Sequence, residues 1–257
     1  MFANDNSTYE LSPDHVGIHN VVCYSGEAAN SIHLAASIAA MKRVVIIGAG
    51  GHGRDVAAII RHQAEIRTGP ALLGFVVDSE WLSEGGASDV PILGDWSWFE
   101  NAEREDLAVI CAVGDPATRK RLVEKAESLG LPFTNAISPS AHIAPDAKIG
   151  AGVMIFPQSV IGRNVLFSDH AIVNAGSTLG HDSQVARYGT IGPGVHLSGN
   201  VSIGEGCDLG VGSSVIPGVA IGAWTTIGAG AAVTRDIPDH VIAAGVPARI
   251  IKTKQAS

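Results

Sequence analysis

The sequence predicts an α/β Rossmann-like N-terminal domain that is followed by a stacked, triangular coil of six-residue repeats. Three observations predict this fold class: a glycine turn between a strand and a helix near residue 50, a period of six residues over about 143–237, and the composition. The chain has 257 residues, of which 31 are glycines, 5% are aromatic and 46% are hydrophobic. That balance favours a repetitive, turn-dense architecture over a core of large aromatic side chains.

We expect the chain to divide into four parts. Residues 1–40 contain no Lys or Arg and no clear periodicity, so we interpret them as a loosely ordered extension, or as the product of an upstream start codon. A secretory or transit peptide would need a basic start. Residues 41–140 form the Rossmann-like domain, 141–237 the repeat domain, and 238–257 a C-terminal cap and tail.

Apolar runs and helix signals place the elements of the first domain in the order β-α-β-β-α-β, as in a short Rossmann-like unit. Asp115 is suited to cap a helix that has Pro116 at its first position, and Gly130 is suited to end that helix. The expected elements are strand 43–47, helix 54–62, strands 72–77 and 107–113, the helix that Asp115 caps, and strand 133–137.

The turn after the first strand matches a GxGxxG spacing at Gly48, Gly50 and Gly53. Such a turn lets backbone N–H groups approach a phosphate at the start of the next helix. About 100 residues cannot hold the second half of a dinucleotide site, so we expect a mononucleotide or nucleotide sugar. The alternative is a tight strand–helix connection without a ligand.

Two side chains near this turn are candidate ligand contacts. Asp78 ends the second expected strand, where a carboxylate could meet a ribose or a base edge. His52 lies within the turn, and its ring could bind a sugar or phosphate, or be an exposed loop histidine.

From Ile143 to Val233 the sequence repeats every six residues without an insertion. Fifteen of the sixteen leading positions are Ile, Leu or Val, and the position three later is Gly, Asn or Asp in twelve. Gly, Asn and Asp tolerate left-handed backbone conformations, so each hexad is predicted to be a short strand and a turn. Three hexads close one triangular coil, with the leading side chain at the axis.

The hexads resemble those of the hexapeptide-repeat acyltransferases, whose fold is a left-handed parallel β-helix. The chain from Met41 resembles the sialic acid O-acetyltransferase family, which includes nucleotide-amino-sugar N-acetyltransferases of the bacillosamine and perosamine type. The motifs that carry the resemblance are Gly48–Gly53, Gly114-Asp115, Gly180-His181-Asp182, Pro193-Gly194, Leu197-Ser198-Gly199-Asn200 and Gly245-Val246-Pro247-Ala248. The resemblance implies a homotrimer with an acetyl-CoA site between subunits.

The resemblance also implies roles for particular residues. His181 would be the general base and Asp182 would raise its basicity. The repeat alone leaves open that Asp182 is only a turn residue and His181 a surface residue. Thr190 stands where the family often has a second histidine, so that contact to acetyl-CoA would lack an imidazole. The remaining implied contacts are Val211 and Ala229 for acetyl-CoA, and Gly50, Gly51 and Gly114, together with His52 and Asp78, for the substrate.

These observations favour an acetyl-CoA-dependent acetyltransferase that N-acetylates a nucleotide-linked deoxyamino sugar. The alternatives are O-acetylation of a sugar of the sialic acid type and a non-catalytic β-helix scaffold. We expect no bound metal, because the spacing of His170, His181 and His196 does not match a zinc carbonic anhydrase site.

Composition excludes several other classes of protein. The net charge of −8 argues against a nucleic-acid partner. The sequence contains no run of 18 apolar residues, so we expect no membrane span. Three cysteines without a CxxC spacing indicate a reducing compartment, and we expect the protein to be cytoplasmic.

Overall fold

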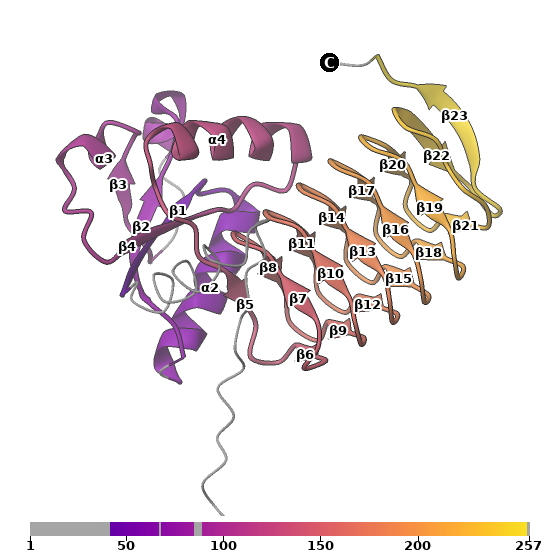
Figure 1. The fold of residues 1–257 in the computed structure, drawn as a ribbon. Helices are drawn as coiled ribbons and strands as arrows, with labels where there is room; N and C mark the ends of the chain where they lie inside the picture. Colours follow the sequence, from indigo (N-terminus) through magenta and orange to yellow (C-terminus); the bar gives the residue numbers. More distant parts are fainter. Residues whose placement is uncertain (1–41, 67, 85–88, 256–257) are drawn as a thin grey trace, which may run out of the picture.

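The computed structural model describes residues 42–66, 68–84 and 89–255, which form a small α/β domain beside a long three-sided prism (Figure 1). The expected extension, residues 1–40, lies outside the described residues. In Figure 1 the α/β domain stands at one end of the prism and the C-terminal strands lie at the other.

The α/β domain is built on a parallel sheet with the strand order β3-β2-β1-β4. Alternate residues of β1 enter two different apolar clusters, Val44 and Ile46 on the α2 side and Val45 and Ile47 on the α4 side. The sheet is therefore covered on both faces, as a parallel sheet requires. The elements are β1 (Arg43–Ile47), α2 (Gly51–Glu65), β2 (Ala71–Val76), the 3-10 helix η1 (Ser79–Glu84), β3 (Ile92–Gly94), α3 (Trp98–Asn101), β4 (Leu107–Cys111) and α4 (Pro116–Ser128).

Helix α4 begins and ends where the sequence predicts. The Asp115 carboxylate accepts a hydrogen bond of 2.7 Å from the backbone N–H of Thr118, and Pro116 is the first helical residue. Gly130, with φ of 69°, takes the left-handed conformation just after the helix.

The strand expected over 133–137 is wrong as a single element, because it is divided between the two domains. Phe133 makes an isolated parallel bridge to β4, whereas β5 (Ala136–Ile137) pairs with the prism strand β8 (Met154–Ile155). Ile137 lies six residues before Ile143, in phase with the repeat, so the prism starts one strand earlier than expected. The fourth strand of the α/β sheet is β3, which is too short to give a periodic signal.

Three parallel sheets form the sides of the prism, and the chain passes from face 1 to face 2 to face 3 in each coil. Face 1 consists of β5, β8, β11 (Ile172–Val173), β14 (Thr190–Ile191), β17 (Asp208–Leu209), β20 (Thr226–Ile227), β22 (Val241–Ala244) and β23 (Arg249–Thr253). Face 2 consists of β6 (His142–Ile143), β9 (Val160–Ile161), β12 (Thr178–Leu179), β15 (His196–Leu197), β18 (Ser214–Val215) and β21 (Ala232–Val233). Face 3 consists of β7 (Lys148–Ile149), β10 (Leu166–Phe167), β13 (Gln184–Val185), β16 (Ser202–Ile203) and β19 (Ala220–Ile221).

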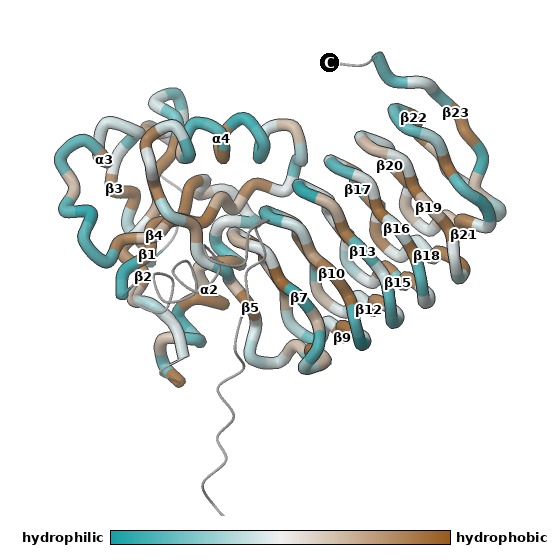
Figure 2. Tube along the Cα trace, viewed as in Figure 1, coloured by the Kyte–Doolittle hydropathy of each residue, from teal (hydrophilic) through white to brown (hydrophobic). Residues whose placement is uncertain are grey.

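The second residue of each two-residue strand points into the prism, and the turn slots take the left-handed conformations that the repeat predicts. Leading residues such as Ile161, Ile191 and Leu209 are fully buried, and hydrophobic bands recur along the coils in Figure 2. Asn164 and Asp182 have φ values of 54° and 62°. The expected fold class, a Rossmann-like α/β domain followed by a left-handed parallel β-helix, is confirmed.

The α/β domain packs on the first coils of face 1. The outward-facing Met154 and Ile172 share an apolar cluster with Val56 and Ile60 of α2. Further along, the outward residues of face 1 are polar, beginning with Thr190. At the far end, β22 pairs in parallel with β20, and β23 returns antiparallel to β22.

Candidate active site

A cleft of about 500 Å³ opens at the carboxyl ends of β1, β2 and β4. In the strand order β3-β2-β1-β4, the chain runs from β1 through β2 to β3 on one side and then crosses to β4 on the other side of β1. Ligands bind at such a switch point in open α/β sheets. The residues lining it are Ile47, Gly48, Ala49, Gly50, Arg54, Val77, Asp78, Glu80, Trp81, Ile92, Trp96, Val113, Thr118, Arg121 and Leu122.

The glycine turn brings the start of α2 to this cleft. Gly48 has φ of 102°, and a Cβ at Gly53 would lie 2.1 Å from the carbonyl oxygen of Gly48, so both positions require glycine. Gly50 caps α2, which begins at Gly51, three residues earlier than expected. A side chain at Gly50 would meet no atom within 4 Å, so the turn is not crowded at this point. The first N–H groups of a helix have no partner within the helix and are suited to an anion.

The expected contact Asp78 lies in the cleft but already has protein partners. Its Oδ1 accepts a hydrogen bond of 2.7 Å from the indole N–H of Trp96, and its Oδ2 lies 3.4 Å from Arg121 Nη2. Arg121 and Arg54 are the two cations of the cleft lining among the described residues, and both suit a phosphate. Trp81 adds a half-exposed indole, a surface on which a base can stack.

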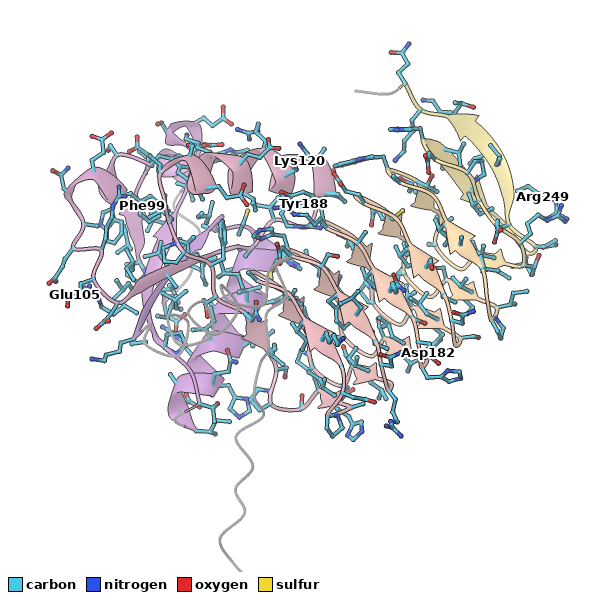
Figure 3. The ribbon with its side chains drawn as sticks, viewed as in Figure 1. Phe99, Glu105, Lys120, Asp182, Tyr188 and Arg249 are labelled. Atoms are coloured by element: carbon cyan, nitrogen blue, oxygen red, sulfur yellow. The ribbon has the colours of Figure 1, made fainter. Side chains whose placement is uncertain are left out.

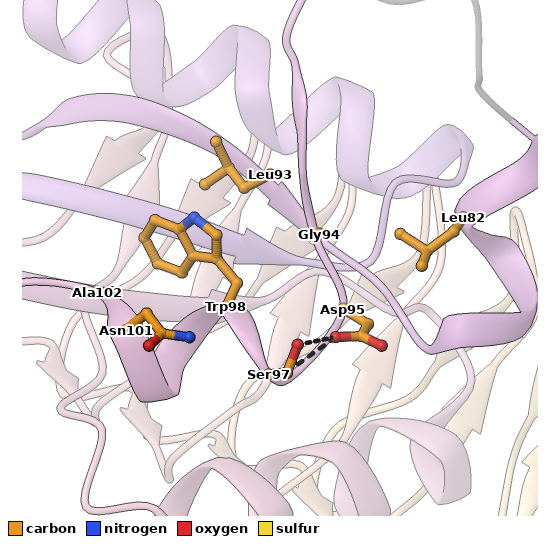
Figure 4. Close-up of a pocket in the computed structure, with 8 residues that line it drawn as sticks. All are labelled: Leu82, Leu93, Gly94, Asp95, Ser97, Trp98, Asn101 and Ala102. Atoms are coloured by element: carbon orange, nitrogen blue, oxygen red, sulfur yellow. Dashed lines mark hydrogen bonds between the residues drawn. The ribbon is translucent and has the colours of Figure 1, made fainter.

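A second hollow, of about 600 Å³, lies at the β3 edge of the sheet, beside α3 (Figure 4). Asp95 is the charged residue in its described lining, and its carboxylate binds Ser79 and Ser97. The bond from Ser97, followed by that from Ser79, lowers the pKa of this carboxyl, which stays negative and unsuited to a phosphate.

Three of the expected substrate contacts, Gly51, His52 and Gly114, lie outside the cleft lining. The His52 ring packs at 4.9 Å from the ring of Phe156, on the prism side of the turn, and its Nε2 is buried without a partner among the described residues. Burial, and after it the charge of Arg119, lowers the pKa of His52 to about 4, so the ring is neutral at neutral pH. The Gly114 carbonyl faces the prism and accepts hydrogen bonds from Arg119 and Thr190.

Arg119, on α4, joins the two domains and was not predicted. Its side chain is fully buried and donates to a cluster of oxygens on both sides of the junction. The acceptors are the carbonyl oxygens of His170 (3.0 Å), Val113 (2.7 Å), Gly114 (2.7 Å) and Tyr188 (2.6 Å), and Thr190 Oγ1 (2.9 Å). Because four acceptors are backbone carbonyls, no sequence motif marks them.

The pair His181–Asp182 lies on the prism edge between faces 2 and 3. His181 Nδ1 is 2.7 Å from Asp182 Oδ2, and Asn164 Nδ2 donates to Asp182 Oδ1 at 2.7 Å from one coil below. The bond from Asn164 and then the bond to His181 lower the pKa of Asp182, so this carboxyl is charged at neutral pH. The histidine side chain is 70% exposed, which leaves Nε2 free to face another molecule.

A glycine one coil above makes room for this imidazole. A Cβ at Gly199 would lie 2.7 Å from both Cε1 and Nε2 of His181. The backbone conformation of Gly199 is not left-handed, so space for the ring is the constraint at this position.

The expected acetyl-CoA contacts lie elsewhere on the prism. Val211 and Ala229 are exposed and stack one coil apart on the edge between faces 1 and 2. Thr190 is on face 1, where the residue is 7% exposed and its hydroxyl is engaged with Arg119 and the Gly114 carbonyl. Figure 3 shows Asp182 at the edge of the prism remote from α4, and Tyr188 beneath α4.

His170, His181 and His196 do not converge: they lie on the edge between faces 3 and 1, on the edge between faces 2 and 3, and on face 2. Across residues 42–66, 68–84 and 89–255, no group of three or more His, Cys, Asp or Glu could hold a metal ion. The helices in those ranges are all too short or too polar to cross a membrane.

Comparisons with known proteins match both halves of the chain. Residues 43–126 match the family model described as PglD N-terminal domain. UDP-N-acetylbacillosamine N-acetyltransferase of Bacillus subtilis (strain 168) is 37% identical over 127 residues, which are 45% of this chain. That match spans about half (51%) of the relative's length.

Solved structures are similar over most of the chain. A mutant of perosamine N-acetyltransferase from Caulobacter crescentus, in complex with CoA and GDP-perosamine, has 37% identity and a TM-score of 0.74 and covers 80% of this chain and 95% of its own. The acetyltransferase domain of PglB from Neisseria gonorrhoeae FA1090 has 33% identity and a TM-score of 0.75, and covers 82% and 100%. The same domain is known in complex with acetyl coenzyme A, at 32% identity and a TM-score of 0.74 over 82% of this chain and 99% of its own.

Proposed function

Because the chain belongs to the bacillosamine- and perosamine-type N-acetyltransferase family, we propose that it transfers the acetyl group of acetyl-CoA to the amino group of a nucleotide-linked deoxyamino sugar. The observation that carries the proposal is the joining of a phosphate-suited cleft at the glycine turn to a prism that presents an exposed His–Asp pair. The relatives solved with CoA and GDP-perosamine support the same pair of ligands.

In the proposed reaction His181 is the general base. The contact to Asp182 holds the ring with its proton on Nδ1, so the lone pair of Nε2 points outward. Nε2 takes a proton from the sugar amine as the amine nitrogen attacks the thioester carbonyl carbon. The carbon–sulfur bond then breaks, and the imidazolium returns the proton to the thiolate of CoA. Asp182 stabilises the imidazolium, because its carboxyl is charged at neutral pH.

A homotrimer supplies the missing half of this site. His181 flanks face 2 on one edge, and Val211 and Ala229 flank it on the other. In a cyclic trimer with face 2 toward the three-fold axis, the two edges of neighbouring subunits meet. The base of one subunit then lies opposite the coenzyme contacts of the next, which accounts for the exposure of His181 in a single chain.

The test of this function is a thiol-release assay with acetyl-CoA and a panel of acceptors: GDP-perosamine, UDP- and dTDP-linked 4-amino-4,6-dideoxy sugars, and free sialic acid. We expect release of CoA with at least one nucleotide amino sugar and none with sialic acid. Reaction with sialic acid alone would assign O-acetylation, and binding of neither CoA nor a nucleotide sugar would assign a scaffold.

Gly199→Ala is expected to lower kcat about 100-fold with little change in melting temperature. The added methyl group would occupy the space of the His181 ring, and a displacement of a catalytic group by about 1 Å has effects of this size. Steady-state kinetics and thermal unfolding of the variant measure both quantities. Ser198→Ala, at the adjacent position, is the control with normal turnover, and wild-type turnover in Gly199→Ala would show that the imidazole is not held here for catalysis.

A further inference from the structure

One carboxylate on face 1, that of Asp208, has no hydrogen-bond or ion-pair partner among the described residues, and the proposed reaction has not used it. Asp208 is the first residue of β17, and its neighbour Leu209 points into the core, so the Asp208 side chain points outward. In the sheet register it lies between Thr190 of β14 and Thr226 of β20. Strands in such a ladder are about 4.8 Å apart, so the three side chains form one row.

The hydroxyls on either side of Asp208 are committed to other groups. Thr190 donates to the Gly114 carbonyl and accepts from Arg119. Thr226 Oγ1 accepts a hydrogen bond of 2.7 Å from Lys254 Nζ, which also donates a hydrogen bond to the Trp224 carbonyl. Within the described part of the chain, no hydrogen bond or ion pair ends on the Asp208 carboxylate.

The surroundings make this lack of a partner costly. Asp208 is half-buried, and burial raises the pKa of its carboxyl against the opposing effect of Lys254 and Arg119. Asp115, across the domain junction, adds a like charge and also raises it. A partly desolvated carboxylate without a protein donor is less favourable than a fully solvated one, so a ligand that brings an N–H donor would gain from binding here.

We propose that Asp208 binds the amino group of the acceptor sugar, an inference that rests on the proposed function. The row of Thr190, Asp208 and Thr226 runs along face 1, and Val211 follows Asp208 at the edge assigned to acetyl-CoA. The Gly114–Asp115 turn at the carboxyl end of β4 faces the same row through the Gly114–Thr190 contact. Asp208 therefore lies between the nucleotide domain and the coenzyme edge, where the amine must reach the thioester.

The chemistry of the ligand fits this site. A sugar amine arrives largely as an ammonium group with three N–H donors, and a carboxylate accepts charge-assisted hydrogen bonds from it. Asp208 holds the nitrogen while the ammonium group releases one proton to solvent. The resulting neutral amine keeps a hydrogen bond to Asp208, and His181 takes the next proton as the nitrogen attacks the thioester. A hydroxyl in place of the amine would offer one neutral donor, so Asp208 would also select amino sugars over their hydroxyl counterparts.

The test compares Asp208→Asn with the wild-type trimer by calorimetry, using GDP-perosamine, its hydroxyl counterpart GDP-rhamnose, and CoA, or the analogous pair for the best substrate of the panel. We expect Asp208→Asn to bind the amino sugar roughly tenfold more weakly and to lose its preference over the hydroxyl sugar. Its affinity for CoA should be unchanged, and its melting temperature unchanged or higher. Asp208→Glu, which keeps the charge, should retain most of the preference.

The outcomes separate this inference from the proposed function. An Asp208→Asn enzyme with wild-type KM and affinity for the amino sugar would overturn the inference while acetyl transfer stands. A selective loss of CoA affinity would also overturn it and would place Asp208 at the coenzyme instead. If Asp208→Asn does not fold, loss of amine preference in Asp208→Glu would decide against the inference. A wild-type protein that acetylates no nucleotide amino sugar would overturn both.

Discussion

His181→Ala is expected to lower kcat for acetyl transfer about 10²–10⁴-fold, the range that a positioned general base contributes. The side chain is 70% exposed and makes its described side-chain hydrogen bond to Asp182, so its removal should leave the fold intact. KM for the nucleotide sugar and for acetyl-CoA should change little, because the base acts on the transition state rather than on substrate binding. Steady-state thiol release and thermal unfolding of the same preparation measure these effects.

Two variants make this experiment specific. Asp182→Asn keeps the shape of the turn but removes the charge beside the imidazole. We expect it to lower kcat less than His181→Ala does, by about tenfold. His62→Ala removes another exposed histidine, from the last turn of α2 and outside face 2, and should keep normal chemistry at the base. Turnover of His181→Ala within twofold of the wild type would rule out His181 as the base and leave Asp182 as a turn residue.

The prism could be predicted from the sequence because its signal is local. Most hexads repeat the same pair of constraints, an aliphatic residue at the axis and a left-handed turn residue three positions later. Sixteen copies average out exceptions in residue type such as Phe167 and Tyr188. The α/β domain has fewer repeated signals. Its helices follow from capping residues, whereas β3, which pairs with β2 over two residues, depends on tertiary contacts alone.

The site shows the same division between local and tertiary signals. The pair His181–Asp182 and the glycine turn are contiguous in sequence, and the structure gives them the expected local geometry. Arg119 and Asp208 are not recognisable in this way, since each resembles an ordinary polar residue of a helix or a repeat. The contacts of Arg119, and the surroundings from which we infer a role for Asp208, arise where α4 meets face 1, between residues that are far apart in the chain.

Arg119→Met is expected to lower the free energy of unfolding by about 3 kcal/mol. Methionine fills a similar length but donates no hydrogen bond, so four buried carbonyl oxygens and the Thr190 hydroxyl lose a donor. Removal of a buried charge offsets part of this loss, because burial already disfavours the guanidinium and lowers the pKa of Arg119 to about 10. For a chain of this size the melting temperature should fall roughly 6–12 °C.

Arg121→Met is the matched control, because Arg121 lies two residues away on the same helix and its side chain is 62% exposed in the cleft proposed for the nucleotide. It should melt like the wild type but raise KM for the nucleotide sugar, since it removes one of the two cleft cations. Arg119→Met should show the opposite pattern, with a lower melting temperature. Thr190→Val, which removes one of the acceptors of Arg119, should lower the free energy of unfolding by about 1 kcal/mol. An Arg119→Met protein with the melting temperature of the wild type would contradict this prediction. It would mean that the apolar contacts between α2 and face 1 hold the two domains together without the guanidinium. It would also mean that Arg119 does not fix the Gly114 turn on the prism.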